Sequence, residues 1–172
     1  VFISDDNSSD DSEKSALNLN IKFYKNKYKN GYGGNVKNAL DVSFKKYNAD
    51  YAVEIHGDGA QFHPNATIDA INLIDKEKPD LICGSRFKCF KENIKLGYPV
   101  IRMVPNFILS TIERIFLKIP ITDFHQGFKV YSKKFFNNIN FDKLSDNYLL
   151  SFEVIVYSKI MNLSIKEVPV LC

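Results

Sequence analysis

The sequence predicts an α/β fold with a mostly parallel central sheet and helices on both faces. Short apolar runs alternate along the chain with stretches whose apolar residues recur at helical spacing. Acidic, glycine and amide residues gather directly after the apolar runs, where open α/β sheets bind their ligands. Internal repeats and low-complexity linkers are absent from the sequence, so we expect a single domain over residues 1–172.

The composition is that of an ordinary globular protein. Hydrophobic residues make up 45% and charged residues 25%, and a net charge of +3 is too small to predict a nucleic-acid partner. No apolar run approaches the ~20 residues of a membrane-spanning helix. Cys83, Cys89 and Cys172 lack metal-ligand spacing, which fits a reducing, cytoplasmic compartment. Because the chain opens on Val1 inside a strand-like run, we expect a fragment that lacks its true N-terminus.

The first expected strand, Val1–Ser4, leads into an acidic run from Asp5 to Asp10. Adjacent carboxylates at a strand end repel one another unless they face water, a metal or hydrogen-bond donors. Asp5, Asp6 and Ser8 are therefore candidates for binding a nucleotide. A capped loop before a short helix is the alternative.

A glycine-rich turn precedes the next helix. It follows a second expected strand, Asn20–Tyr24, and contains Gly33 and Gly34. Free N–H groups at a helix N-terminus bind anions, and Lys37 adds positive charge there. Gly34 and Lys37 are candidates for contacting a diphosphate, and an ordinary loop with a surface lysine is the alternative. The stretch does not match the dinucleotide fingerprint or the phosphate-binding loop.

The central stretch follows a third expected strand at 50–53. Gly57 and Gly59 flank Asp58, so the backbone can turn sharply and a charged group can come close. Hard oxygen ligands suit Mg²⁺ or Mn²⁺, and a lone carboxylate here can hold such a cation against two phosphates. A polar turn between the strand and a helix that begins near Pro64 is the alternative.

A fourth expected strand at 80–84 places Arg86 just beyond its end. The guanidinium is always charged and its planar fork suits a phosphate, whereas a salt bridge to a nearby Asp is the alternative. Residues 88–99 lack periodicity, so we expect a mobile loop over the site.

An amphipathic helix is expected next, over 101–118, and a later start at Pro105 is the alternative. Arg102 near its beginning is another candidate for a phosphate or an acceptor. Asp123 and His125 follow, and either is a candidate general base, although a structural role for the histidine is the alternative. The remaining elements that we expect are a strand around 128–131, a short helix from 132, a helix over 148–161 and a strand at 164–170.

Six stretches, in this order, resemble the motifs of the inverting family-2 glycosyltransferases of the GT-A fold, close to dolichyl- and undecaprenyl-phosphate sugar synthases. They are Asp5–Asp10, Asn30–Asn38, Gly57–Pro64, Gly84–Phe87, Thr122–Tyr131 and Lys166–Val170. They are similar to the family's Asp-Asp-Gly-Ser nucleotide motif, glycine-rich segment, Asp-x-Asp-Gly-Gln-x-x-Pro metal motif, Gly-Ser-Arg, Ser-Gly-Phe-Arg stretch and Glu-Val-Pro ending. Each motif is weak alone, and together they span almost the whole chain.

The resemblance implies a Rossmann-like GT-A enzyme of cell-envelope glycan synthesis. It would move a hexose, with inversion, from a UDP- or GDP-sugar to a polyprenyl phosphate or a glycan hydroxyl. Asp58 and His56 would bind Mg²⁺ or Mn²⁺, Arg86 would neutralise the leaving group, and Asp123, or else His125, would be the base for a hydroxyl acceptor. The residues implied for nucleotide-sugar binding are Asp5, Asp6, Ser8, Gly34, Lys37, Asp58, Gln61, Arg86 and Arg102.

The sequence departs from the family pattern in three places. His56 stands where the first Asp of the metal motif is usual, Ala60 is inserted before Gln61, and the family's first strand with Pro-x-x-Asn-Glu is absent. Basic residues between Lys88 and Arg102 lead us to expect a peripheral contact with the inner face of a membrane. The alternatives of other classes are a response-regulator receiver and a sugar nucleotidyltransferase.

Overall fold

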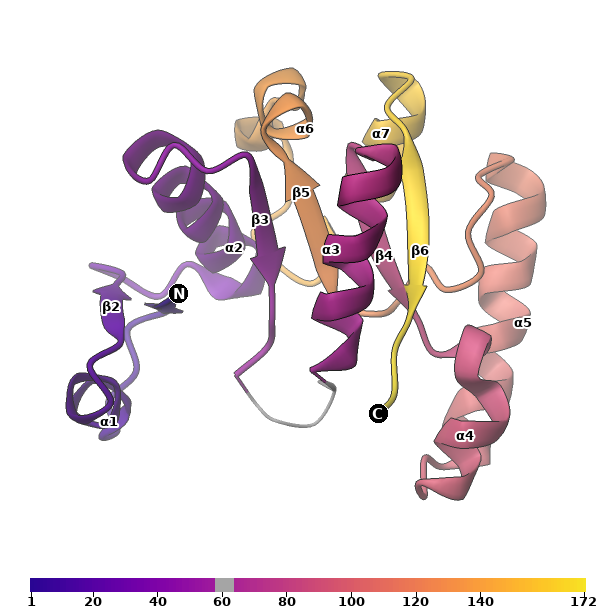
Figure 1. Cartoon of the computed structure of the whole chain (residues 1–172), viewed down its shortest axis with the longest axis horizontal. Coiled ribbons are helices and arrows are strands. Elements are labelled where there is room, and N and C mark those ends of the chain that lie inside the picture. Colours follow the sequence, from indigo (N-terminus) through magenta and orange to yellow (C-terminus); the bar gives the residue numbers. More distant parts are fainter. Residues whose placement is uncertain (58–63) are drawn as a thin grey trace.

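The computed structural model describes residues 1–57 and 64–172 (Figure 1). Its strands are β1 (Phe2–Asp5), β2 (Lys22–Lys25), β3 (Tyr51–Glu54), β4 (Leu81–Ser85), β5 (Lys129–Ser132) and β6 (Ile165–Pro169). Its α-helices are α1 (Ser12–Asn18), α2 (Gly31–Asp41), α3 (Asn65–Glu77), α4 (Phe90–Lys95), α5 (Val100–Leu117), α6 (Lys133–Asn138) and α7 (Leu150–Ile160). A π-helical turn, Val42–Lys46, extends α2.

Four strands form a mixed sheet in the order β3-β5-β4-β6, and β1 pairs with β2 in a separate parallel ladder. β4 and β6 are parallel, whereas β5 is antiparallel to both β3 and β4. The predicted α/β fold is confirmed, and the sheet is partly parallel, because β5 is reversed among three strands that share one direction. Side-chain alternation is the same in both directions, so the sequence pattern does not reveal this reversal.

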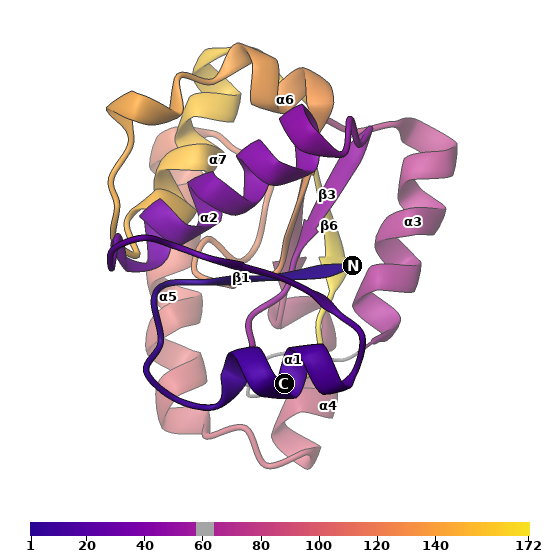
Figure 2. The same cartoon turned by 90° about the vertical axis from the view of Figure 1, so that its left-hand side faces the viewer.

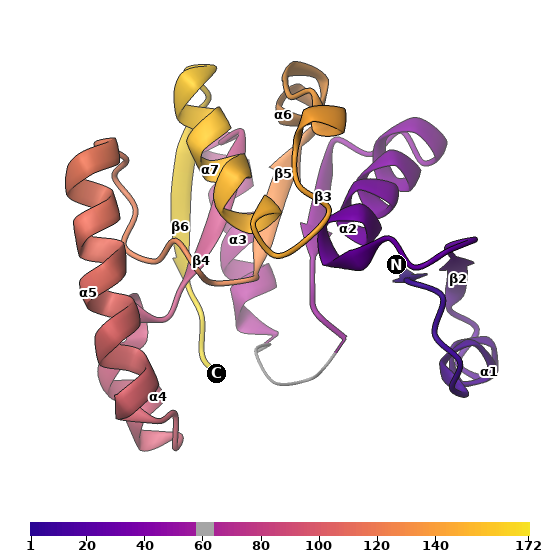
Figure 3. The same cartoon turned by 180° about the vertical axis from the view of Figure 1, so that it is seen from behind.

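Helices cover both faces of the four-stranded sheet, as predicted. Figure 1 shows α3 in front of it, and Figure 3, from behind, shows α7 on the other side. Successive residues of β4 serve opposite faces: Ile82 packs with Ala66 and Ala70 of α3, and Leu81 belongs to the cluster that contains Val154 of α7. Packing on both faces therefore holds the strands, and the residues at their ends, in fixed positions.

The β1–β2 pair and α1 lie beyond the β3 edge of this sheet (Figures 1 and 2). Asn35 of α2 connects them to the rest of the molecule. Ser4 Oγ donates to Asn35 Oδ1 at 2.7 Å, and Asn35 Nδ2 donates to the Ser4 carbonyl oxygen at 3.0 Å. The acidic run after β1 is thereby held next to the start of α2.

The mobile loop expected over residues 88–99 is wrong, because this segment contains α4. Asn93 of α4 is fully buried. Its Nδ2 donates to the carbonyl oxygens of Arg86 (3.0 Å) and Val170 (3.1 Å), and its Oδ1 accepts from Cys172 N (2.8 Å). A single polar anchor of this kind leaves no periodic signal in the sequence.

The long helix α5 begins at Val100, so the alternative start at Pro105 is wrong and the proline lies within the helix. Among the described residues, no helix is both long enough and apolar enough to cross a membrane.

Candidate functional site

The predicted functional residues follow the ends of three strands. β1 ends at Asp5, β3 ends two residues before His56, and β4 ends next to Arg86. Figure 1 shows the arrows of β3 and β6 pointing to the same edge, and β4 is parallel to β6. We therefore place the candidate site at this edge, where α/β sheets bind ligands.

Asp6 caps the start of α2. Its Oδ1 accepts from Asn30 N at 2.8 Å and Asn26 Nδ2 at 3.0 Å, and its Oδ2 accepts from Gly31 N at 2.9 Å. Burial acts to raise the pKa of Asp6, but these hydrogen bonds outweigh it and lower the pKa. Asp6 is thus a charged helix cap, and its contact with a nucleoside stays a prediction.

Asp5 has more capacity for a ligand. It is buried, and its Oδ2 accepts from Ser8 N at 2.8 Å. The turn between them passes through Asn7 in the left-handed region, with φ of 61°. Asp5 Oδ1 accepts no hydrogen bond from any other described residue, and the contact of Asp5 with a nucleoside stays a prediction.

Gly34 and Lys37 face the segment that follows residue 143. Gly34 N donates to the Asp146 carbonyl oxygen at 3.2 Å, and Lys37 Nζ donates to Asp146 Oδ1 at 2.8 Å and to the Leu144 carbonyl oxygen. A Cβ at Gly33 would lie 2.8 Å from the Asn147 carbonyl oxygen. The glycines therefore permit close packing. Gly34 N and two of the three N–H donors of Lys37 already have partners, and the predicted diphosphate contact stays a prediction.

Glu54 is the centre of a buried polar cluster that we did not predict. Its Oε1 accepts from Tyr32 OH at 2.6 Å and lies 3.3 Å from His56 Nε2, and its Oε2 accepts from Tyr131 OH at 2.6 Å. Lys129, fully buried, pairs with Glu54 in the β3–β5 register. Burial acts to raise the pKa of Glu54, but His56, Lys129 and the two phenols outweigh it and lower the pKa. The cluster thus stabilises a carboxylate beneath the site.

Neighbours on several elements position His56. Besides the contact with Glu54, its ring meets the Tyr32 ring edge-on at 5.3 Å between centroids. The ring also lies against Gly127, where an added Cβ would be 2.7 Å from His56 Nε2. Only glycine at position 127 leaves room for this placement, which explains the glycine of the Gly127-Phe128-Lys129 stretch.

The predicted metal site lies partly outside the described residues, because Asp58 and Gln61 fall between residues 57 and 64. Within the two described ranges, no three His, Cys, Asp or Glu side chains cluster closely enough to hold a metal ion. His56 therefore does not supply a metal centre with described neighbours alone. The cation predicted for Asp58 and His56 stays a prediction, and we assign no chemical step to it.

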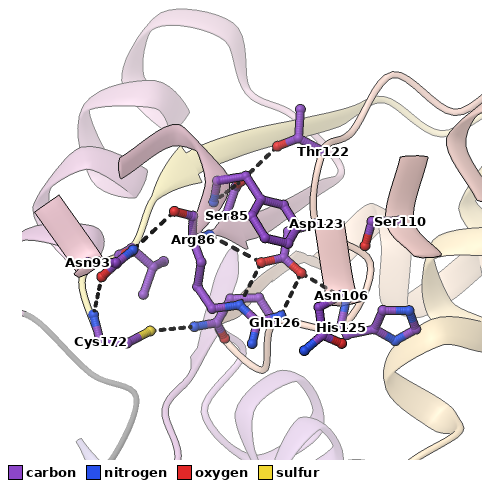
Figure 4. A network of polar contacts seen from close by, with 12 residues as sticks. Ser85, Arg86, Asn93, Asn106, Ser110, Thr122, Asp123, His125, Gln126 and Cys172 are labelled. Atoms are coloured by element: carbon purple, nitrogen blue, oxygen red, sulfur yellow. Dashed lines mark hydrogen bonds and ion pairs between the residues drawn. The ribbon is translucent and has the colours of Figure 1, made fainter. Parts of the chain in front are cut away.

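Arg86 and Asp123 form a bidentate ion pair at the end of β4 (Figure 4). Arg86 Nε donates to Asp123 Oδ2 at 2.7 Å, and Arg86 Nη2 donates to Asp123 Oδ1 at 2.9 Å. Tyr98 OH accepts from Arg86 Nη1 at 2.9 Å. Burial acts to lower the pKa of Arg86, but Asp123 and Tyr98 raise it, so the guanidinium is charged at any working pH.

This ion pair bears on both predicted roles, that of Arg86 as a phosphate ligand and that of Asp123 as a base. Each Asp123 oxygen already accepts from Arg86, and the backbone N–H groups of Arg86 and His125 add bonds of 3.2 Å each. A carboxylate occupied in this way orients Arg86, and its predicted role as a base stays untested. One N–H each of Nη1 and Nη2 makes no hydrogen bond to another described residue, so Arg86 retains two donors for an anion.

A second carboxylate, Glu167 of β6, supports the turn that carries Asp123. Its Oε1 accepts from Thr122 N at 2.6 Å and from Asp123 N at 3.1 Å. Thr122 Oγ1 in turn lies 2.7 Å from Ser85 Oγ at the end of β4. Burial raises the pKa of Glu167. The end of β4 and the turn at 122–123 therefore form one hydrogen-bonded unit.

His125 follows Asp123 and contacts α5, the helix that carries Arg102. His125 Nε2 is 3.0 Å from Glu113 Oε2 of α5, and its ring stacks near Phe152 with centroids 6.3 Å apart. Arg102 is exposed on α5. The structure thus assembles Arg86, Asp123 and His125 in one place, while Gly34 and Lys37 of α2 contact the segment at Leu144 and Asp146.

Comparisons with known proteins agree with this geometry. Residues 1–139 match the protein family Glycosyl transferase family 2. The chain belongs to this family. The match contradicts the receiver alternative, as does β5, since receivers have a parallel doubly wound sheet.

Two curated relatives cover most of the chain. An uncharacterised protein of Methanocaldococcus jannaschii is 25% identical over 99% of this chain and 68% of its own length. The UDP-N-acetylglucosamine–dolichyl-phosphate N-acetylglucosaminyltransferase of Methanococcus voltae is 29% identical over 87% of this chain and 57% of its own length. The chain therefore spans little more than half of that enzyme.

Solved structures confirm the GT-A fold. Glucosyl-3-phosphoglycerate synthase of Mycobacterium tuberculosis, in complex with Mn²⁺, UDP-glucose and phosphoglyceric acid, has a TM-score of 0.70 at 16% identity. The similarity covers 98% of this chain and 57% of that one. A UDP complex of the same synthase with Mn²⁺ and glucosyl-3-phosphoglycerate gives a TM-score of 0.67 at 15% identity.

Proposed function

We propose that this family-2 domain transfers a sugar, with inversion, from a UDP- or GDP-sugar to a lipid phosphate. The observation that carries the proposal is the family match over residues 1–139, which includes Asp5, Arg86 and Asp123. The Methanococcus voltae relative is named for a UDP-sugar donor and a dolichyl-phosphate acceptor, which supports both substrate classes. A divalent cation at Asp58 and His56 is part of the proposal.

Arg86 is the residue that we assign to the leaving diphosphate. Departure of the nucleotide builds negative charge on the diphosphate, and a fixed guanidinium in a site shielded from water stabilises that charge strongly. The bidentate bond to Asp123 and the contact with Tyr98 hold the guanidinium before the substrate arrives. Such preorganisation means that little reorganisation is needed during the reaction.

The state of Asp123 supports a phosphate acceptor over a hydroxyl acceptor. A phosphate oxygen is already anionic and attacks the anomeric carbon without a base, whereas a hydroxyl must lose a proton. Asp123, the first candidate base, is committed to Arg86 through both oxygens. For a glycan hydroxyl acceptor, His125 with its partner Glu113 is the remaining candidate among the predicted bases.

A transfer assay tests this proposal. Purified protein is incubated with radiolabelled UDP- or GDP-sugars and either a polyprenyl phosphate or a glycan, with Mn²⁺ or Mg²⁺ present. We expect label in the lipid phosphate and a product anomer opposite to that of the donor. Transfer to the glycan alone would overturn the acceptor class, and retention of the anomer would overturn the mechanism.

A further inference from the structure

The helix α5 presents a broad apolar surface to solvent. It lies at the edge of the molecule that is remote from β1 and β2 (Figures 1 and 3). Its exposed large apolar side chains, which we call the α5 face, are Val100, Ile101, Val104, Phe107, Ile108, Leu109, Ile112, Ile115 and Phe116. Contiguous apolar surface of this extent on a folded domain indicates an interaction site.

The α5 face is opposite the side by which the helix packs on the domain. Met103 and Ser110 are the buried residues of α5. At about 100° per residue, Ile108, Ile112 and Ile115 fall on the opposite side of the helix. The helix is therefore apolar on both sides, and folding of the described chain covers only one of them.

Cations border the α5 face. By the same helical spacing, Arg102 and Arg114 lie on its two borders, and Lys118 follows the last turn. Lys91 and Lys95 are exposed on the neighbouring α4. None of these five forms an ion pair with another described residue. The acidic residue of α5, Glu113, is already engaged with His125.

The same helix contacts the candidate site. Ser110 Oγ accepts from Phe124 N at 3.3 Å, and Phe107 meets the Phe87 ring edge-on at 5.2 Å between centroids. Phe87 and Phe124 are the residues directly after Arg86 and Asp123. A partner bound to the α5 face would therefore keep the candidate site at a fixed distance from the partner's surface.

We propose that the α5 face docks on an anionic lipid bilayer, with the helix lying in the plane of the interface. Apolar side chains bordered by unpaired cations are what such a surface binds, through burial below the headgroups and attraction to their charge. A second copy of the chain fits less well, because a two-fold interface would bring the same positive borders together. This inference rests on the proposed function in one respect: a lipid-phosphate acceptor is held in the bilayer on which the α5 face would dock.

Vesicle co-sedimentation tests the docking surface. The protein is mixed with phosphatidylcholine vesicles with and without phosphatidylglycerol, at low and high salt. The test variant is Ile115→Glu, and the matched control is Ile160→Glu on α7, since the two side chains are 65% and 62% exposed. Neither substitution disturbs the core, so both variants are expected to fold.

We expect the protein and the Ile160→Glu variant to bind the anionic vesicles, and Ile115→Glu to bind at least about tenfold more weakly. High salt weakens binding because the cations contribute. No binding by the unmodified protein, or equal binding by Ile115→Glu, would overturn the proposal. So would a concentration-dependent dimer that Ile115→Glu dissociates, which would identify a second copy as the partner.

Titration of UDP into the same samples separates this inference from the proposed function. Vesicle binding without nucleotide binding would contradict the transferase proposal and leave the docking surface standing. Nucleotide binding without vesicle binding would do the reverse.

Discussion

Arg86 and Asp123 join the end of β4 to the turn before β5 through two nearly parallel hydrogen bonds, Nε to Oδ2 at 2.7 Å and Nη2 to Oδ1 at 2.9 Å. Both side chains are almost completely buried, with exposed fractions of 7% and 0%. Breaking the pair is therefore expected to destabilise the fold. Displacing Arg86 is expected to weaken the proposed contact with the diphosphate.

Asp123→Asn tests the structural side of this pair. The substitution leaves a buried guanidinium without its counter-charge, so we predict a loss of about 3–5 kcal/mol in the free energy of unfolding. Urea denaturation followed by circular dichroism measures it, with the exposed Asp142→Asn as the control. A loss below about 1 kcal/mol would mean that the pair is as weak as a surface ion pair.

The buried pair of Glu54 and Lys129 is expected to show strong coupling. Glu54→Gln and Lys129→Met each remove one of two opposite charges, so each is expected to cost about 1–3 kcal/mol. Glu54 keeps its bonds from Tyr32 and Tyr131 in the lysine variant, and Lys129 keeps its bond to the Gln126 carbonyl oxygen in the glutamate variant. In the double variant both charges are absent, so a double-mutant cycle should give a coupling energy of at least about 1 kcal/mol. Additive single effects would show that Tyr32, Tyr131 and His56 stabilise the Glu54 carboxylate without help from Lys129.

Gly127→Ala is predicted to displace His56. The added Cβ would lie 2.7 Å from His56 Nε2, whereas a Cβ at Gly57 would meet no atom within 4 Å. We expect Gly127→Ala to cost about 1–3 kcal/mol of stability and to shift the NMR signals of the His56 ring. Gly57→Ala is the matched control and should change stability by less than about 0.5 kcal/mol. Unshifted His56 signals in Gly127→Ala would contradict the observed packing.

Asp80 gives a prediction for pH. Burial acts to raise its pKa, but hydrogen bonds from Ser164 and Lys134 outweigh it and lower the pKa below the ordinary 3.8. A lowered carboxylate pKa stabilises the fold fully above the ordinary value, and this stabilisation is lost as the pH falls through the folded value. We therefore expect the unmodified protein to lose stability more steeply than Asp80→Asn between about pH 4 and pH 2. Equal slopes in urea titrations across that range would contradict this assignment.

Much of the fold follows from the sequence, because apolar alternation and helical spacing report burial directly. The six expected strands and the helices after them are present close to their predicted bounds. Asn93 and Glu167 are examples of what the pattern omits. Asn93 bonds to Val170 and Cys172, which lie 77 and 79 residues away, and Glu167 bonds to Thr122, 45 residues away. No local periodicity records such contacts.

The sequence predicted the types of residue at the candidate site better than it predicted which of them contact one another. The position of Arg86 after β4 indicated a functional cation, and a salt bridge to a nearby Asp was the stated alternative. The structure shows that ion pair with Asp123, which no spacing rule connects to Arg86. Lys129 is the clearest missed signal, since a lysine inside an apolar strand needs a buried partner, and Glu54 lies opposite it.

The central claim is that the candidate site at the strand ends binds a nucleoside diphosphate. Calorimetric titration of UDP and GDP into the protein, with and without Mn²⁺, tests it most directly. Asp58→Ala is the test variant and Asp75→Ala, exposed on α3, is its control. We predict Mn²⁺-dependent binding of one nucleotide that Asp58→Ala abolishes and Asp75→Ala preserves. Absence of binding to the folded protein, or equal binding by Asp58→Ala, would contradict the account.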